Sequence, residues 1–144
     1  MSLQVEKITD QNELDSAFKI RKEVFVEEQK VNAEDECDEF EDSSFHFLAK
    51  LEGTPVGTAR WRFTEKGVKL ERFAVLKEAR GKGIGQALVQ YVLEDIATHS
   101  NADSKTKYLH SQILAISLYE KFGFKKVGDI FEECNILHFK MERS

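Results

Sequence analysis

Three glycines at alternate positions, Gly81, Gly83 and Gly85, follow Arg80 and come directly before a run with helical periodicity. The first N–H groups of a helix have no acceptor within the helix, and with the positive end of the helix dipole they attract anions. Glycine at these positions removes side chains that would hold an anion away from the amides. The stretch therefore predicts a phosphate-binding site formed by Arg80, Gly81, Lys82, Gly83, Ile84 and Gly85.

The spacing of the glycines separates this site from two common nucleotide motifs. A P-loop needs G-x-x-x-x-G-K followed by Ser or Thr, but Gly81-Lys82 has no glycine five residues upstream and is followed by Gly83. The dinucleotide fingerprint G-x-G-x-x-G meets Gln86 at its third glycine, and the preceding strands are expected to be antiparallel rather than parallel. A helix start that is rich in glycine only for packing is the other alternative.

Hydrophobic periodicity predicts the elements that must position this loop. A short strand over residues 4–8 precedes a helix that Asp10 or Asn12 can cap and that ends near residues 25–28. Three strands over 45–53, 56–63 and 68–75 form an antiparallel meander, and a helix begins near Lys82 or Gly83. A strand over 107–112, a helix over 113–122 stopped by Gly123, and closing strands over 124–128 and 135–141 complete the chain.

Composition excludes several classes of protein. The 144 residues, 41% of them hydrophobic, predict a single domain over residues 1–144 with a real core. A net charge of -5 argues against a nucleic-acid binder, and no apolar run approaches the length of a membrane span. Cys37 and Cys134 form no disulfide framework and no apolar signal segment opens the chain, so we expect a cytoplasmic protein.

No metal site is predicted. The two cysteines lack the C-x-x-C or histidine-rich surroundings of a zinc site. A site made from His46, Asp38 and Asp42 is conceivable, but their spacing alone is weak support for it.

Arg80-x-x-Gly83-x-Gly85 resembles the acyl-CoA pyrophosphate motif [QR]-x-x-G-x-[GA] of the GNAT acetyltransferase superfamily. Tyr119 and Gly123-Phe124 match that superfamily's Y-x-x-x-G-F pattern, and Gln112 stands where asparagine is commoner. The segments 21–29 and 133–141 further resemble its small bacterial ElaA/YjcF-like subgroup. The resemblance covers most of the chain. It implies an α/β (α+β) GNAT fold, with about four helices flanking a mixed sheet of six or seven strands that is largely antiparallel and has a parallel splay at the cofactor site.

The resemblance also implies a function. It implies that the protein moves an acetyl group from acetyl-CoA to a primary amine of a small molecule or peptide, by direct attack in a ternary complex. The backbone of Phe73, Ala74 and Val75 would bind the pantetheine arm, residues 80–85 the pyrophosphate, and Gln112 would add a further cofactor contact. An acyl-CoA-binding sensor or interaction module without turnover is the alternative, since the same motif would permit it. A homodimer is possible, as dimers are frequent in the family.

Amine acetylation needs a proton for the leaving thiolate and a group that takes a proton from the amine. By the resemblance Tyr119 is the candidate acid and a cofactor contact; the alternative is a core aromatic. Glu71, His110 and His138 are candidates for the base, and His138 for substrate binding. Strand alternation places Arg72 on the face opposite to Glu71, together with Leu70 and Ala74, and Arg72 is a candidate substrate contact.

The segment from Glu27 to Asp42 holds nine acidic residues in sixteen, which indicates a solvated loop or, alternatively, a surface that attracts a cationic amine. Residues 21–29, which overlap the start of this segment, match the subgroup's R-x-x-V-F-V-x-E-Q pattern. By this resemblance, the candidate substrate contacts in the wall of the acceptor cleft are Arg21, Glu28 and Gln29. Arg21 is expected to anchor a carboxylate, either of the substrate or, in an internal ion pair, of the protein itself.

Overall fold

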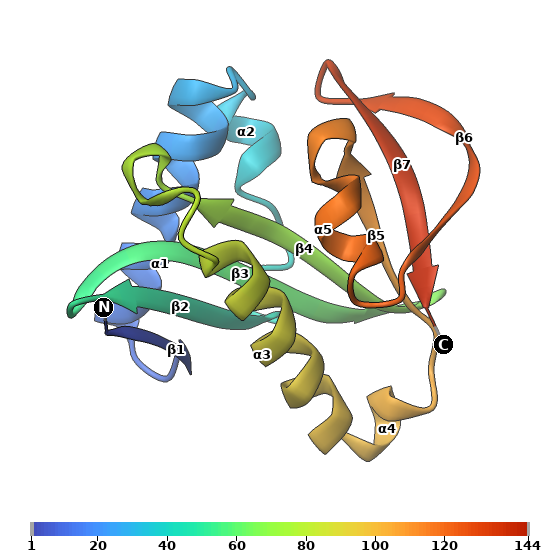
Figure 1. Cartoon of the computed structure of the whole chain (residues 1–144), viewed down its shortest axis with the longest axis horizontal. Helices are drawn as coiled ribbons and strands as arrows, with labels where there is room; N and C mark the ends of the chain where they lie inside the picture. The colour runs from blue at the N-terminus through green and yellow to red at the C-terminus, as the bar shows by residue number, and fades with distance from the viewer. Residues whose placement is uncertain (1, 144) are drawn as a thin grey trace.

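The computed structural model describes residues 2–143, and its strands form one seven-stranded sheet (Figure 1). The strands follow one another across the sheet in the order β1-β2-β3-β4-β5-β7-β6. Their bounds are β1 Leu3–Lys7, β2 Phe45–Leu51, β3 Thr54–Thr64, β4 Gly67–Val75, β5 Lys107–Gln112, β6 Lys125–Glu133 and β7 Ile136–Arg143.

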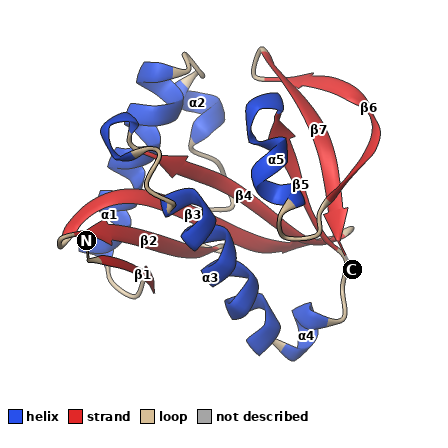
Figure 2. Cartoon of the chain, in the orientation of Figure 1, coloured by secondary structure: helices blue, strands red, loops and turns tan. Residues whose placement is uncertain are grey.

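The helices are of very unequal length (Figure 2). The α-helices are α1 Gln11–Arg21, α2 Ala33–Glu36, α3 Ile84–Thr98, α4 Ser100–Asp103 and α5 Ile116–Glu120. A π-helical turn, η1 (Lys22–Glu28), continues α1, and 3-10 turns, η2 (Lys77–Ala79) and η3 (Ile113–Ala115), precede α3 and α5. The predicted mixed α+β fold is confirmed, and the helices beyond the predicted four are single turns. Within residues 2–143, no helix combines the length and apolarity needed to cross a bilayer.

One parallel pair interrupts the antiparallel sheet. Strands β1 to β4 pair antiparallel in sequence order, as the predicted meander requires. Strand β4 pairs parallel with β5 only at Val68 with Lys107 and Lys69 with Tyr108. Beyond these residues β4 and β5 run apart like the arms of a V (Figure 1). The second half of β4 therefore has no neighbour on the β5 side.

Helices α1 and α3 cover opposite faces of the sheet (Figure 1). The side chain of Asp10 caps α1 by accepting a hydrogen bond of 2.8 Å from the Glu13 amide. Apolar side chains recur at helical spacing on both helices, so each buries one stripe. On α1 and η1 these are Ala17, Ile20 and Val24, and on α3 they are Ile84, Leu88, Val92 and Ile96.

A β-bulge changes the facing of residues in the second half of β4. The pairing with β3 shifts between Thr58 and Arg60, so that β4 holds one extra residue there, and Arg72 has a φ of 60°. As a result Leu70 packs in the core under α3, whereas Ala74 packs in the core under α1. The predicted alternation, which put both residues and Arg72 on one face, is wrong because it assumed a regular strand.

Candidate functional site

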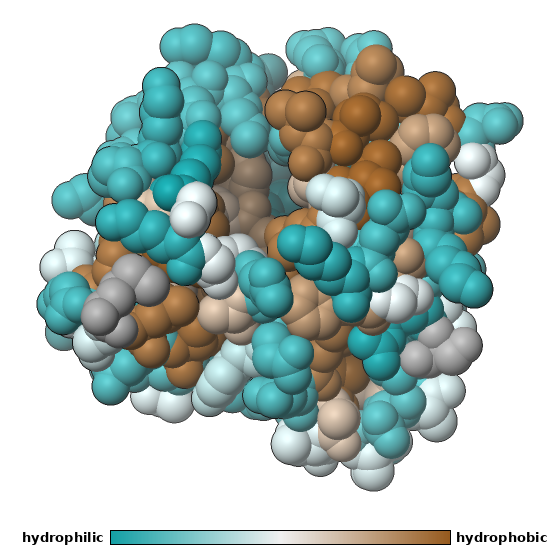
Figure 3. All heavy atoms as spheres, viewed as in Figure 1, coloured by the Kyte–Doolittle hydropathy of each residue, from teal (hydrophilic) through white to brown (hydrophobic). Residues whose placement is uncertain are grey.

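A cleft of about 690 Å³ opens where β4 and β5 diverge. The molecular surface is hollowed between a mainly hydrophilic wall over α1 and α2 and a mainly hydrophobic wall over α5 and β7 (Figure 3). Residues from η1, β4, β5, α5 and the β6–β7 hairpin line it. The lining includes most of the side chains singled out from the sequence, namely Gln29, Glu71, Arg72, Phe73, Ala74, Val75, Arg80, His110, Gln112, Tyr119 and His138.

The glycine-rich loop presents free backbone donors. Gly81 and Gly83 have φ of 81° and 80°, a region that glycine adopts without strain, and a Cβ at either would meet no atom within 4 Å. Packing therefore does not explain these two glycines. Helix α3 begins at Ile84 with Gly83 as its cap, and within the described residues the N–H groups of residues 81–86 donate to no protein acceptor.

Arg80 is held beside this loop by Glu28. Its Nε donates to the Val75 carbonyl at 3.0 Å, and its two terminal nitrogens donate to the two Glu28 oxygens at 2.7 and 2.6 Å. The Arg80 hydrogen bonds hold the pKa of the Glu28 carboxyl below its usual value. Glu28 therefore lies against the predicted phosphate loop. Glu28 is not among the residues that line the cleft, and its predicted contact with the acceptor stays a prediction.

The end of β5 and the end of η1 meet across the cleft. The side-chain amide of Gln112 donates to the Gln29 oxygen at 2.9 Å, and both residues line the cleft. Phe73, Ala74 and Val75 lie opposite, on the part of β4 that does not pair with β5. The structure thus brings together the predicted contacts for an extended ligand running between the two strands.

Tyr119 lies in the wall of the cleft. Its ring packs edge-on against Phe73 and Phe124, with centroids 5.8 and 6.2 Å away. Burial raises the pKa of the Tyr119 phenol well above its usual value. Its hydroxyl stays protonated and makes no hydrogen bond to the described part of the chain. Tyr119 is therefore protonated at neutral pH, and its hydroxyl has a hydrogen to donate to a group bound in the cleft.

Glu71 is held by three cations. Its carboxylate accepts from Arg60 at 2.8 Å, from Arg62 at 2.6 Å and faces Lys69 at 3.4 Å. Burial favours the neutral acid, but the charges of Arg60 and the other cations outweigh it and keep the Glu71 pKa below its usual value. The structure therefore argues against Glu71 as the base, because protonating it would break these ion pairs.

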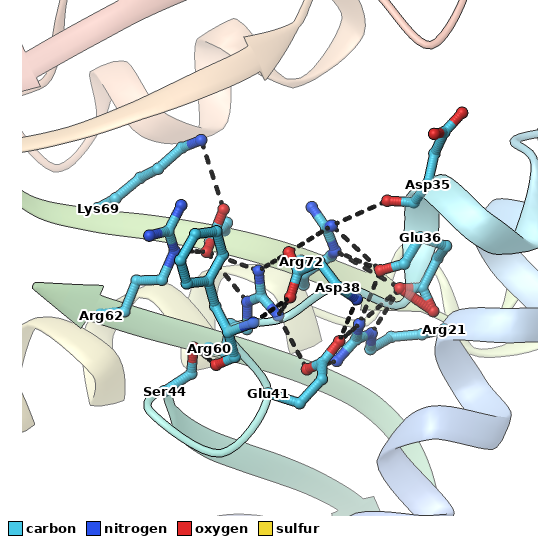
Figure 4. A network of polar contacts seen from close by, with 12 residues as sticks. Arg21, Asp35, Glu36, Asp38, Glu41, Ser44, Arg60, Arg62, Lys69 and Arg72 are labelled. Carbon is cyan, nitrogen blue, oxygen red and sulfur yellow. Dashed lines mark hydrogen bonds and ion pairs between the residues drawn. The ribbon is translucent and has the colours of Figure 1, made fainter. Parts of the chain in front are cut away.

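Arg21 is buried and is not among the residues that line the cleft; Figure 4 shows it within the network of polar contacts around Glu41. Only 1% of the residue is exposed, and its guanidinium donates to the Glu36 carboxylate at 2.6 Å and to Glu41 at 2.6 Å. Burial opposes the charge, yet these carboxylates raise the Arg21 pKa further. The internal ion pair replaces substrate contact as the role of Arg21.

Arg60 of β3 binds carboxylates of the acidic segment, residues 27–42. It is fully buried and donates to Asp38 at 2.6 Å and to Glu41 at 2.8 Å, in addition to Glu71. Arg72 donates to the Glu36 carbonyl at 3.1 Å and to Asp38 at 3.2 Å (Figure 4). The expectation of a solvated loop is therefore wrong for Glu36, Asp38 and Glu41, whose carboxylates pair with arginines.

A cluster that sequence reasoning missed joins the two predicted histidines. Glu133 Oε2 lies 3.3 Å from His110 Nδ1, and Glu133 Oε1 lies 4.0 Å from His138 Nε2. The hydrogen bond with His110 lowers the Glu133 pKa to about 2, against the opposing effect of burial. All three residues line the cleft. The available signal was the pairing of Glu133 with Ile136 across a two-residue turn, which puts Glu133 on the same face as His138.

Metal chemistry has no candidate within residues 2–143, where no group of His, Cys, Asp and Glu has the arrangement of a metal site. Two of the residues considered for a metal site have other partners. The Asp38 carboxylate accepts hydrogen bonds from Arg60 and Arg72, and His46 Nε2 lies 2.8 Å from the Glu41 carbonyl oxygen.

The chain is similar in sequence to known proteins. Residues 5–144 match the model of the acetyltransferase (GNAT) domain. The chain is 37% identical to the uncharacterised N-acetyltransferase YjcF of Bacillus subtilis over 92% of this chain and 93% of that protein. It is 31% identical to the protein ElaA of Escherichia coli over 92% of this chain and 88% of ElaA.

Solved structures agree with the sequence comparison. The crystal structure of Escherichia coli ElaA superimposes with a TM-score of 0.87 over 99% of this chain and all of that chain, at 25% identity. An aminoglycoside 6'-N-acetyltransferase complexed with coenzyme A superimposes with a TM-score of 0.74 over 97% of this chain and 96% of that chain, at 16% identity. At 16% identity, the similarity to the aminoglycoside acetyltransferase shows that the two proteins share a fold.

Proposed function

The chain belongs to the GNAT acetyltransferase family, and from this premise we propose that it transfers an acetyl group from acetyl-CoA to a primary amine of a small molecule or peptide. The amine attacks the thioester directly in a ternary complex. The observation that carries the proposal is the meeting of two features, the gap between β4 and β5 and the unpaired amides of residues 81–86. The aminoglycoside acetyltransferase, with coenzyme A bound, has the same fold.

The loop supports binding of a diphosphate. The positive φ of Gly81 and Gly83 turns the backbone so that no side chain covers its amides, and α3 adds the positive end of its dipole. Lys82 and Arg80 add cationic groups, and Ile84 and Gly85 begin the helix that carries the dipole. An incoming diphosphate would compete with the Glu28 carboxylate for Arg80.

The diverging strands support binding of the pantetheine arm. Backbone groups of Phe73, Ala74 and Val75 on the β5 side of β4 have no strand partner, and the arm is an extended amide chain that can pair with them. One of the N–H groups in this stretch would also stabilise the oxyanion of the tetrahedral intermediate. Gln112 lies at the opposite side of the gap, at the end of β5.

Tyr119 supplies the proton for the leaving group. Its hydroxyl has no competing hydrogen bond in the described chain and is protonated at neutral pH, since burial raises its pKa. Because a buried tyrosinate is unfavourable, the loss of this proton to sulfur is coupled to the return of a proton from nitrogen. Once the C–N bond has formed and the C–S bond breaks, the phenol protonates the thiolate and takes a proton back from the acetylated nitrogen. Acetyl-CoA itself supplies the activated acyl group.

The test is calorimetric titration with acetyl-CoA and with CoA, followed by a screen for thiol release over amine acceptors. Micromolar binding with release for one class of amine supports the proposal and identifies the acceptor class. Binding without release for any amine supports the alternative, an acyl-CoA sensor without turnover. Absence of binding would overturn the assignment of residues 80–85.

A further inference from the structure

The carboxylates that line the cleft differ in their partners. Glu36, Asp38 and Glu71 are each bound to at least one arginine, whose positive charge is permanent. Asp35, an exposed carboxylate at the rim, makes no ion pair with the described chain and has no histidine beside it. Glu133 has no arginine or lysine within ion-pair distance in the described chain and instead faces His110 and His138. Within ion-pair distance, its negative charge is therefore compensated only when one of these histidines is protonated or when a cation enters the cleft.

Hydrogen bonding defines the tautomer of His138. The Ile136 carbonyl can only accept a hydrogen bond, and it lies 2.7 Å from His138 Nδ1, so Nδ1 carries the hydrogen. In the neutral ring the lone pair is then on Nε2, which lies 4.0 Å from Glu133 Oε1. Two acceptors thus face each other in the cleft, and the His138 side chain is only 8% exposed. A hydrogen-bond donor placed between Glu133 Oε1 and His138 Nε2 would satisfy both acceptors.

The surroundings hold these groups in place. The Phe131 ring stacks on His138 with centroids 5.7 Å apart and meets His110 edge-on at 5.0 Å. Lys69 of β4 also acts on Glu133 electrostatically but is bound to Glu71 at 3.4 Å. Glu133 is itself about half exposed, so a cation can reach it from the open side of the cleft.

We propose that Glu133 and His138 form the binding site for the protonated amine of the acceptor, and that Nε2 of His138 removes one of its protons. This proposal rests on the proposed acetyl transfer and names its acceptor as a primary ammonium compound. An N–H bond of the ammonium breaks, a new N–H bond forms at Nε2, and the nitrogen keeps the electron pair with which it attacks the thioester. The Glu133 carboxylate stabilises the resulting imidazolium until its proton returns to water.

The binding step can be tested without turnover. The probe is n-butylammonium chloride, and the readout is the imidazole carbon signals of the four histidines, with potassium chloride at equal ionic strength as reference. We expect the His138 and His110 signals to shift and saturate with n-butylammonium but not with potassium.

The test variant is Glu133→Gln, and the matched control is Glu132→Gln. Glu132 is also an exposed carboxylate of β6, but it pairs with Leu137 and so faces the other side of the hairpin. The site should bind n-butylammonium about tenfold more weakly in Glu133→Gln and unchanged in Glu132→Gln. Absence of a saturable shift in the wild-type protein, or equal binding by Glu133→Gln, would overturn the proposal.

The proton-transfer step is tested with His138→Asn, whose amide can still donate to Ile136 but which has no group at the position of Nε2. We expect kcat to fall at least tenfold with acetyl-CoA affinity unchanged. A normal kcat would refute the role of Nε2. Acetyl-CoA titration separates the two proposals: ammonium binding without acetyl-CoA binding contradicts the transferase, whereas acetyl-CoA turnover without dependence on Glu133 contradicts only the ammonium site.

Discussion

At the scale of single residues, burial and pairing decide which ionisable groups can take part in chemistry. Glu71 and Arg21 have suitable chemical groups but are held in ion pairs. Tyr119 is buried among aromatic rings without a partner for its hydroxyl in the described chain, and its raised pKa keeps that hydroxyl protonated at neutral pH. The environment of a residue therefore restricts its role more strongly than its type does.

The first prediction concerns Tyr119. Replacing it with Phe keeps the ring that packs against Phe73 and Phe124 and removes only the hydroxyl. Turnover should fall by about 10²-fold or more, since that is the usual contribution of a general acid, while acetyl-CoA affinity should hardly change. Steady-state rates and calorimetric titration measure the two effects. An unchanged rate would assign the proton to water or to another group.

The second prediction concerns the pair between Glu28 and Arg80. Glu28→Gln removes a negative charge beside the phosphate loop and frees the guanidinium, so CoA should bind about threefold to tenfold more tightly at low salt. The gain should shrink at high salt because exposed charges are screened. Glu27→Gln, which alters an adjacent exposed carboxylate, is the control. Weaker binding by Glu28→Gln would mean instead that Glu28 holds Arg80 in its binding position.

At the scale of elements, two local irregularities build the site. The loop before α3 needs positive φ at Gly81 and Gly83, and the bulge in β4 needs positive φ at Arg72. The loop turns its amides outward, while the bulge lets Phe73 face Tyr119 and lets Arg72 reach the acidic segment. A helix start capped by a side chain would not leave these amides free, and a regular strand would not turn Arg72 toward the acidic segment.

The third prediction tests the loop. Gly83→Asp places bulk and negative charge beside the free amides, so CoA affinity should fall by about tenfold or more. Gly53→Asp is the matched control, because Gly53 also has a φ of 80° and open space around its Cβ but lies in the β2–β3 turn. Both variants should lose about 1–2 kcal/mol of stability from backbone strain. Equal CoA affinity of the two folded variants would remove the phosphate role.

At the scale of the whole molecule, the buried ion pairs connect the first helix, the acidic segment and the sheet. Arg21 comes from α1, Arg60 from β3 and Arg72 from β4, and all three bind residues 36–41 (Figure 4). This segment forms one side of the cleft, so the same contacts that stabilise the fold also shape the site. The homodimer expected from the family stays a prediction, which light scattering can check.

The fourth prediction concerns acid stability. Burial would raise the Glu41 pKa, but Arg21 and Arg60 lower it from 4.5 to about 2, and Arg60 likewise lowers that of Asp38 from 3.8 to about 2. A carboxyl whose pKa is depressed on folding stabilises the protein above its unfolded pKa and loses that contribution as pH falls to the folded value. The free energy of unfolding should therefore decline between about pH 5 and pH 2.

Glu41→Gln provides the direct measurement. At pH 7 it should lower the free energy of unfolding by about 2–3 kcal/mol, and the difference from the wild type should shrink toward pH 2, where Glu41 itself becomes protonated. Urea unfolding at several pH values measures this. Glu39→Gln, an exposed carboxyl in the same segment, should behave like the wild type. A difference independent of pH would show that charge pairing is not the cause.

The sequence by itself determined the order of the main strands and helices, the family and the position of the glycine-rich loop before α3. These features depend on residues that are close together in the chain, since apolar periodicity and the spacing from Arg80 to Gly85 are local patterns. Most predicted strands and helices agree with the structure to within two or three residues, with α3 beginning at Ile84 instead of near Lys82 or Gly83. The strand predicted over 124–128 is too short, since β6 continues to Glu133, and the short helices α2 and α4 were not predicted.

Only the tertiary structure decided which charged groups meet. Glu133 reaches His110 across 23 residues, and Glu28 reaches Arg80 across 52. Such contacts depend on strand order and register, which local patterns do not contain. One extra residue in β4 was enough to reverse the facing of Arg72, because side chains alternate only while a strand is regular. The glycine-rich loop could therefore be predicted from neighbouring residues, whereas the cluster of Glu133, His110 and His138 depended on the folded sheet.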